Sequence, residues 1–209
     1  MKNLVFMTCV ISALVVSVFS VKCYSCCSEN NSTCKNVTVI DCIGDKCMTL
    51  SQNLFSGMNS VPAIFKGCAI DEMCENKARA SGENLRYRLY ASCCIEDLCN
   101  EDEYRLPADD PTPNGLECPT CYSINSTEEC VSKKKINCTG NENQCFTYLG
   151  VIKDPGGSVL DYSLKGCANN FSCKVTATKH IGIIKLYGKG VSCYTPHPNP
   201  VTPKYTQES

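Results

Sequence analysis

The sequence predicts an all-β protein made of two disulfide-rich modules in tandem. The first observation is the cysteine content: the 209 residues include 20 cysteines and no tryptophan, so cross-links replace much of a hydrophobic core. The second is that the order and spacing of the cysteines occur twice along the chain. The third is that β-branched and aromatic runs bounded by turn residues separate the cysteines, and no segment has a convincing helical periodicity.

Residues 1–20 have the pattern of a cleaved secretory signal peptide. Lys2 precedes an apolar run from Leu4 to Phe19, and Ser20 is a suitable cleavage position. A transmembrane anchor fits less well, because the run has only 16 residues and no basic cluster follows it. We therefore expect residues 21–209 to be secreted and extracellular, in an oxidising compartment where the cysteines form disulfides.

The cysteine spacing divides the chain into two modules. With Cys27 left aside, the intervals from Cys23 to Cys93 are 2, 7, 7, 4, 20, 5 and 18 residues, and those from Cys118 to Cys193 are 2, 8, 7, 6, 21, 5 and 19. The stretch "FKGCAIDEMC" in the first half also matches "LKGCANNFSC" in the second. We expect module 1 at residues 21–106, an acidic Pro-rich linker at 107–117, module 2 at 118–193 and a Pro-rich tail at 194–209.

Module 2 lacks the ending of module 1. Residues 93–100 read "CCIEDLCN", whereas the chain after Cys193 continues as "YTPHPNPVTPKYTQES" without a CC-x4-C-N motif. Two interpretations stay open: the protein has lost this terminal loop, or the sequence is a truncated or alternatively spliced form.

Strand patterns lie between the cysteines. "FTYLGVI" and "SVLDYSL" flank the turn-rich "KDPGG", which predicts a hairpin over residues 146–164. In residues 84–92, apolar Leu85, Tyr87 and Leu89 alternate with Arg86 and Arg88, as in a strand with one solvated face. Residues 180–193 predict a second strand of this kind.

Adjacent cysteines occur at two places. Neighbouring Cα atoms are ~3.8 Å apart, less than the roughly 4.4–6.8 Å of an unstrained disulfide, so Cys93 and Cys94 should bond to other partners. Cys27 lies beside Cys26 and makes the cysteine count of module 1 odd. It could remain an idle thiol, carry a small-molecule mixed disulfide, replace Cys26 as the partner of Cys34, or join two copies into a homo-oligomer.

The cysteine pattern of module 1, from C-x2-C to CC-x4-C-N, resembles the three-finger module of the lymphocyte-antigen-6 and urokinase-receptor superfamily. The resemblance covers nearly all of residues 21–209. It implies two three-finger modules, with Asn100 fixing the base of the fingers of module 1 by hydrogen bonds. It also implies nine disulfides, namely Cys23–Cys47, Cys26–Cys34, Cys42–Cys68, Cys74–Cys93, Cys94–Cys99, Cys118–Cys145, Cys121–Cys130, Cys138–Cys167 and Cys173–Cys193.

The sequence offers no catalytic motif. Neither G-x-S-x-G nor H-E-x-x-H occurs, and the two histidines, His180 and His197, lie in a strand-like run and in the Pro-rich tail. "CPTC" and "CYSCC" resemble zinc half-sites, but secretion favours disulfides over thiolate ligands. We expect a protein that is not an enzyme and uses no metal or other cofactor. Because the total charge is near neutral, we also expect no nucleic-acid partner.

Charge is divided unevenly between the halves. Residues 21–117 hold 9 basic and 15 acidic side chains, whereas residues 118–209 hold 10 basic and 6 acidic ones. This polarity could orient the modules against each other, or direct Lys133, Lys134 and Lys135 toward an acidic partner or anionic lipid, although such runs are more often solvated faces.

Six N-x-S/T sequons are candidates for glycosylation in an extracellular protein. Five lie in or near the first finger of either module, so sugars there would leave fingers two and three for partner contacts. The six asparagines are Asn30, Asn31, Asn36, Asn125, Asn137 and Asn170.

The middle finger of module 1 carries an apolar tip, "NLFSGMNSV". It places Leu54, Phe55 and Met58 around a glycine turn, where exposed apolar groups favour partner binding. If this finger folds back onto its own sheet, the same residues are ordinary packing.

Two tandem modules, the second opening with "PNGLECPTCY", resemble the gamma-type phospholipase A2 inhibitors. The resemblance implies a secreted binding protein that sequesters a secreted phospholipase A2 by protein–protein contact. The alternatives are a cell-surface or adhesion module similar to the urokinase receptor, and a toxin-like receptor modulator. We expect no glycolipid anchor, because the tail after Cys193 has no hydrophobic stretch of ~10–20 residues.

Overall fold

The computed structural model describes residues 20–28, 31–56, 58–103, 105–153, 159–177, 180–181 and 184–196. As predicted, these residues are almost entirely β-strand. The strands of module 1 are β1 (Ser20–Ser28), β2 (Thr38–Ile43), β3 (Cys47–Ser56), β4 (Asn59–Cys68), β5 (Lys77–Gly82) and β6 (Leu85–Cys94), with the 3-10 turn η1 at Asp71–Met73. Module 2 contains β7 (Pro113–Ile124), β8 (Lys134–Thr139), β9 (Gln144–Lys153), β10 (Val159–Ala168), helix α2 (Asn170–Ala177), β11 (His180–Ile181) and β12 (Ile184–Tyr194).

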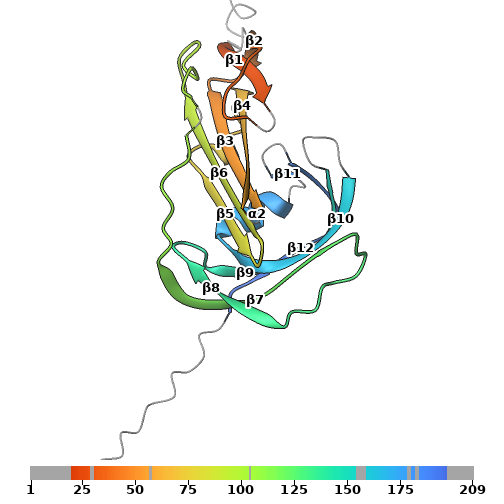
Figure 1. Ribbon diagram of the computed structural model, residues 1–209. Helices are drawn as coiled ribbons and strands as arrows, with labels where there is room; N and C mark the ends of the chain where they lie inside the picture. The colour runs from red at the N-terminus through yellow and green to blue at the C-terminus, as the bar shows by residue number, and fades with distance from the viewer. Residues whose placement is uncertain are drawn as a thin grey trace, which may run out of the picture.

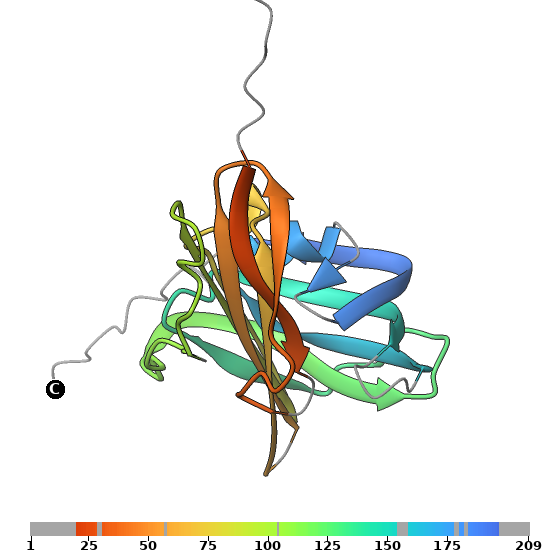
Figure 2. The same cartoon turned by 90° about the horizontal axis from the view of Figure 1, so that it is seen from above.

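The two modules share one sheet. Its strand order is β11-β12-β9-β10-β5-β6-β3-β4-β1-β2, and β7 pairs with both β10 and β8. Figure 1 shows the module 1 strands, orange to yellow-green, standing over the strands of module 2, and Figure 2 shows the two sets crossing. The sequence did not predict this continuity between the modules.

The predicted strands occupy their expected places. β9 and β10 pair from Val159 opposite Lys153 to Ala168 opposite Gln144, which matches the hairpin predicted over 146–164. Its turn, residues 154–158, lies outside the described residues. Along β6 the side chain of Tyr87 is buried and that of Arg86 is exposed, as the alternation predicts. β7 begins at Pro113, so the last five residues of the range predicted as linker form strand.

Helix α2 was not predicted. Asn169 acts as its N-cap, because its side-chain oxygen accepts a hydrogen bond from the Ser172 amide at 2.9 Å and its carbonyl accepts one from the Cys173 amide at 3.2 Å. The sequence "NNFSC" lacks the apolar period of an amphipathic helix, so a local cap and the packing against β5 decide the structure of this segment.

Nine disulfides hold the modules, and each lies within one module. They are the nine pairs that the resemblance implies. Buried cystines form the base of each module, with Cys23, Cys42 and Cys47 in module 1 and Cys118 and Cys138 in module 2. The side chain of Cys27 is exposed, and this residue belongs to none of the nine pairs.

Asn100 ties the end of module 1 to its first strands. Its side-chain oxygen accepts a hydrogen bond from the Tyr24 amide at 2.9 Å, and its side-chain nitrogen donates to the carbonyls of Tyr24 at 2.9 Å and Met48 at 3.1 Å. The side chain is buried, so these three bonds satisfy groups that water does not reach. Asn100 therefore has the position that the resemblance implies.

The apolar core spans both modules. It combines Leu50, Tyr87 and Leu89 of module 1 with Tyr148 and Leu164 of module 2. Burying this apolar surface favours the docked arrangement of the modules over two separate ones. The hydrophobic effect thus adds to the strand pairing that joins the modules.

Two buried tyrosines should titrate well above the ordinary range. Burial raises the pKa of Tyr148 to about 12 and raises the pKa of Tyr87 well above its ordinary value of 10.0. Both pKa values are higher in the folded than in the unfolded chain, so stability should be constant below pH ~10 and decrease as the pH rises toward ~12. Urea unfolding with a parallel tyrosinate absorbance titration measures this, and Tyr148→Phe should remove one high-pH step. Ionisation of every tyrosine near pH ~10 in the folded protein would contradict it.

Candidate binding cleft between the modules

The modules meet through a pair of edge strands. β10 pairs antiparallel with β5, with Gly166 opposite Gly82 and Ala168 opposite Ala80. The two backbones approach so closely that a Cβ atom on residue 166 would lie 2.0 Å from the carbonyl oxygen of Ser81. A glycine at 166 is therefore required for the strands to pair.

Polar groups at the start of α2 strengthen this junction. The buried side chain of Asn169 donates to the Lys77 carbonyl at 2.6 Å and accepts from the Arg79 amide at 3.2 Å. The hydroxyl of Ser172, also buried, accepts from the Arg79 amide at 2.8 Å and donates to the Arg79 carbonyl at 2.7 Å. These bonds satisfy the free edge of β5 and fix the angle between the modules.

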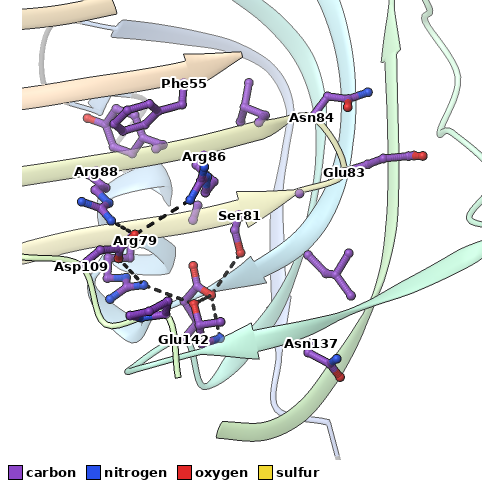
Figure 3. Close-up of a pocket in the computed structure, with 17 residues that line it drawn as sticks. Phe55, Arg79, Ser81, Glu83, Asn84, Arg86, Arg88, Asp109, Asn137 and Glu142 are labelled. Atoms are coloured by element: carbon purple, nitrogen blue, oxygen red, sulfur yellow. Dashed lines mark hydrogen bonds and ion pairs between the residues drawn. The ribbon is translucent and has the colours of Figure 1, made fainter. Parts of the chain in front are cut away.

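A cleft of about 330 Å³ lies beside the junction. The β5–β6 hairpin forms one wall, module 2 forms the other, and the linker crosses one end (Figure 3). Its lining includes Phe55, Arg79, Ser81, Glu83, Asn84, Arg86, Arg88, Asp109, Pro111, Ile136, Asn137, Thr139 and Glu142.

Three arginines dominate the module 1 wall. Arg79 and Arg88 lie opposite each other in the β5–β6 pairing, and Arg86 lies two residues from Arg88 on the same face. Like charges directly opposite in a sheet are destabilising. The carboxylate of Asp109 compensates, because it pairs with Arg79 at 2.8 Å and with Arg88, and lies 4.0 Å from Arg86.

Phe55 supports two of these arginines. It lies opposite Arg86 in the β3–β6 pairing. The guanidinium carbons of Arg86 and Arg88 are 5.6 Å and 5.8 Å from the centre of its ring, within the range of cation–π attraction. The ring therefore holds both guanidinium groups at the cleft surface.

The opposite wall contains a buried carboxylate. Glu142 is only 2% exposed and accepts hydrogen bonds from the Ser81 hydroxyl at 3.0 Å, the Thr139 amide at 3.0 Å and the Thr139 hydroxyl at 3.2 Å. The bond from Ser81 crosses between the modules. Glu142 is thus a structural carboxylate whose oxygens face internal donors.

The lysine run of module 2 is mainly engaged within the protein. Lys134 pairs with Glu83 of module 1 at 2.9 Å, and Lys135 lies 3.8 Å from Glu117. The Lys134–Glu83 pair supports the interpretation that opposite charges orient the modules. Both members of this pair are substantially exposed, so it contributes little to stability.

The structure separates the three predicted tip residues. Leu54 packs against the shared core, which makes it ordinary packing. Phe55 lines the cleft, and Met58 is fully exposed at the finger tip. Successive residues of a strand point to opposite faces, so Leu54 and Phe55 could not serve the same contact.

The predicted sequons lie mostly on the surface. Asn36, Asn125, Asn137 and Asn170 are exposed, and Asn31 is half-buried, whereas Asn30 lies outside the described residues. Asn137 also lines the cleft, so a sugar at this position would stand at its module 2 wall. Glycosylation itself stays a prediction.

The remaining sequence features add no second site. The sulfur atoms of Cys118, Cys138 and Cys167 cluster, but all three belong to disulfides and therefore present no thiolate for a metal. The side chain of His180, and all of His197, lie outside the described part of the structure. No helix among the described residues is long and apolar enough to cross a bilayer.

Sequence reasoning missed the arginine cluster and Asp109. A signal was present, because all four arginines of the chain, Arg79, Arg86, Arg88 and Arg105, fall within 27 consecutive residues. Arginine binds carboxylates through a planar fork that lysine lacks, so this restriction points to carboxylate recognition. The position of Asp109 depends on the path of the linker across the sheet, which no local pattern encodes.

Comparisons with known proteins agree with this architecture. The u-PAR/Ly-6 domain model matches residues 20–102 and 114–199. A phospholipase A2 inhibitor gamma chain of Elaphe climacophora is 29% identical over 168 residues, which cover 78% of each chain. Phospholipase A2 inhibitor NAI of Notechis ater is 27% identical over 99% of this chain and 100% of its own, and Protein RoBo-1 of Rattus norvegicus is 27% identical over 91% and 78%. The repeated cysteine framework, the nine cystines and these matches show that the chain belongs to the u-PAR/Ly-6 family.

Proposed function

We propose that this protein is a secreted, non-enzymatic binding protein that inhibits a secreted phospholipase A2 by protein–protein contact. The observation that carries the proposal is the similarity to phospholipase A2 inhibitors over both modules and the linker. u-PAR/Ly-6 domains are binding modules, and the cleft presents arginines held by ion pairs and an aromatic ring without a nucleophile–base pair. The protein therefore acts by occupying a surface of the enzyme.

The shared sheet supports binding by a fixed surface. Two modules on a flexible linker would lose orientational freedom on association, whereas modules joined by strand pairing have already lost it on folding. In this proposal the contact surface consists of the cleft, with Phe55 at its edge, and the exposed tip at Met58. Asn137 lies on the same surface, so a sugar there would restrict access.

The test uses the full chain with its disulfides intact. We expect it to form a complex with at least one member of a panel of secreted phospholipases A2, measured by surface plasmon resonance, and to slow hydrolysis of micellar phospholipid by that enzyme. Because cross-links hold the contact surface together, the reduced and alkylated protein should lose both effects.

Complex formation must account for the inhibition. The inhibitor should act at concentrations near the dissociation constant of the complex, whatever the amount of micelle present. The absence of a complex with every enzyme of a representative panel would refute the proposal, and so would inhibition that disappears when micelles are added in excess.

A further inference from the structure

We propose that Phe55, Arg86 and Arg88 form a carboxylate-recognition site that captures an acidic side chain of a protein partner. These three residues are called the arginine face below. The inference deepens the proposed function and rests on it only for the identity of the partner. It is carried by charge, geometry and shape within the inter-module cleft.

The arginine face has more cationic groups than its own carboxylate can pair. Three guanidinium groups surround Asp109, which lies 2.8 Å from Arg79 and also pairs with Arg88. The other lining carboxylates are engaged elsewhere, since Glu142 accepts from Ser81 and Thr139, and Glu83 pairs with Lys134. A second carboxylate would therefore find a positive potential at the mouth of the cleft.

Arg86 is the group with unused capacity. Among the described residues its one carboxylate contact is Asp109 at 4.0 Å, the limit of an ion pair. Its side chain is 62% exposed, whereas those of Arg79 and Arg88 are 17% and 19% exposed. A guanidinium group has five donors in a planar fork, so Arg86 can bind an incoming carboxylate through two parallel hydrogen bonds.

Phe55 prepares this geometry in advance. Its ring lies under both Arg86 and Arg88, which restricts the two side chains before the partner arrives. Less side-chain entropy is then lost on binding, which strengthens the interaction. The ring also offers an apolar surface for the methylene groups of a glutamate or aspartate.

The shape of the cleft favours a protein segment over a membrane. A volume of about 330 Å³ is at the lower end of small-molecule pockets and admits one or two side chains. A flat bilayer cannot enter it, and the acidic side chain of Glu83 at the rim opposes an anionic lipid surface. An acidic loop satisfies both the charge and the shape.

The direct test needs no phospholipase. Hexaglutamate is titrated into the folded protein at low salt, while NMR follows the side-chain N–H signals of Arg86 and the ring signals of Phe55. We expect both sets to shift, with an affinity that decreases as salt is added. Arg86→Gln should weaken binding about tenfold because a charge-assisted hydrogen bond is lost, Arg86→Lys should weaken it less, and Phe55→Ala should resemble Arg86→Gln.

The matched control is Lys35→Gln, which removes one exposed positive charge from the first finger of module 1 and should leave the affinity unchanged. Equal weakening by Lys35→Gln, or unshifted Arg86 signals, would overturn the inference. Preferential binding to phosphatidylserine vesicles would overturn it in favour of a lipid ligand. Because hexaglutamate replaces the enzyme, the arginine face can fail while phospholipase inhibition stands, and the reverse.

Discussion

Gly166→Ala should separate the two modules while leaving every disulfide able to form. The added Cβ atom would lie 2.0 Å from the carbonyl oxygen of Ser81 and 3.0 Å from the Cα atom of Gly82. Backbone atoms cannot rotate away as a side chain can, so β10 must leave β5. We expect a loss of about 3 kcal/mol in the free energy of unfolding, at the upper end of overpacking effects.

Hydrogen exchange and small-angle scattering measure this effect. The amides of residues 80–82 and 166–168 should lose protection, and the radius of gyration should increase. Gly82→Ala is the matched control, because its Cβ atom would meet the Lys165 carbonyl at 3.3 Å, a contact that a shift of a few tenths of an ångström relieves. Equal effects of the two substitutions would show that the junction does not depend on the close approach at Gly166.

The double substitution Cys138→Ala with Cys167→Ala should cause the other large loss. The disulfide closes a loop with a sequence separation of 29, for which chain entropy gives about 3–4 kcal/mol. Both residues are fully buried among the cystines of module 2, so their removal also leaves a void. Urea unfolding monitored by circular dichroism measures the change.

Its control is Cys26→Ala with Cys34→Ala. That disulfide has a sequence separation of only 8 and its cysteines are partly exposed, so the same model gives about 2.5 kcal/mol and no buried void. A loss from the short loop as large as that from the long one would contradict the dependence on loop length and burial.

The repeat in the sequence predicted the modules, and alternation along the strands predicted their faces. Leu85, Tyr87 and Leu89 alternate with arginines, which specified β6 because one face of that strand is buried. The middle hairpin of module 2 was predictable for a similar reason, since a turn-rich stretch separates two β-prone runs. In both cases the information lies within a few residues of the element.

What the sequence did not predict depends on contacts between distant segments. Gly166 and Gly82 look like ordinary strand glycines until β5 and β10 meet, and Asn169 caps a helix that lacks an apolar period. Asp109 is one acidic residue in an acidic linker until its carboxylate reaches the arginines. The arginine face therefore emerges from tertiary structure, although the restricted distribution of arginine was visible beforehand.

The strand pairing between β5 and β10 has a consequence for valency. Two modules on a free tether bind as separate units, with an avidity set by the effective concentration that the tether imposes. Here the second module stands at a fixed angle to the first, so lengthening residues 107–112 should leave affinity almost unchanged. A partner thus encounters one composite epitope, and neither module alone should reproduce its recognition.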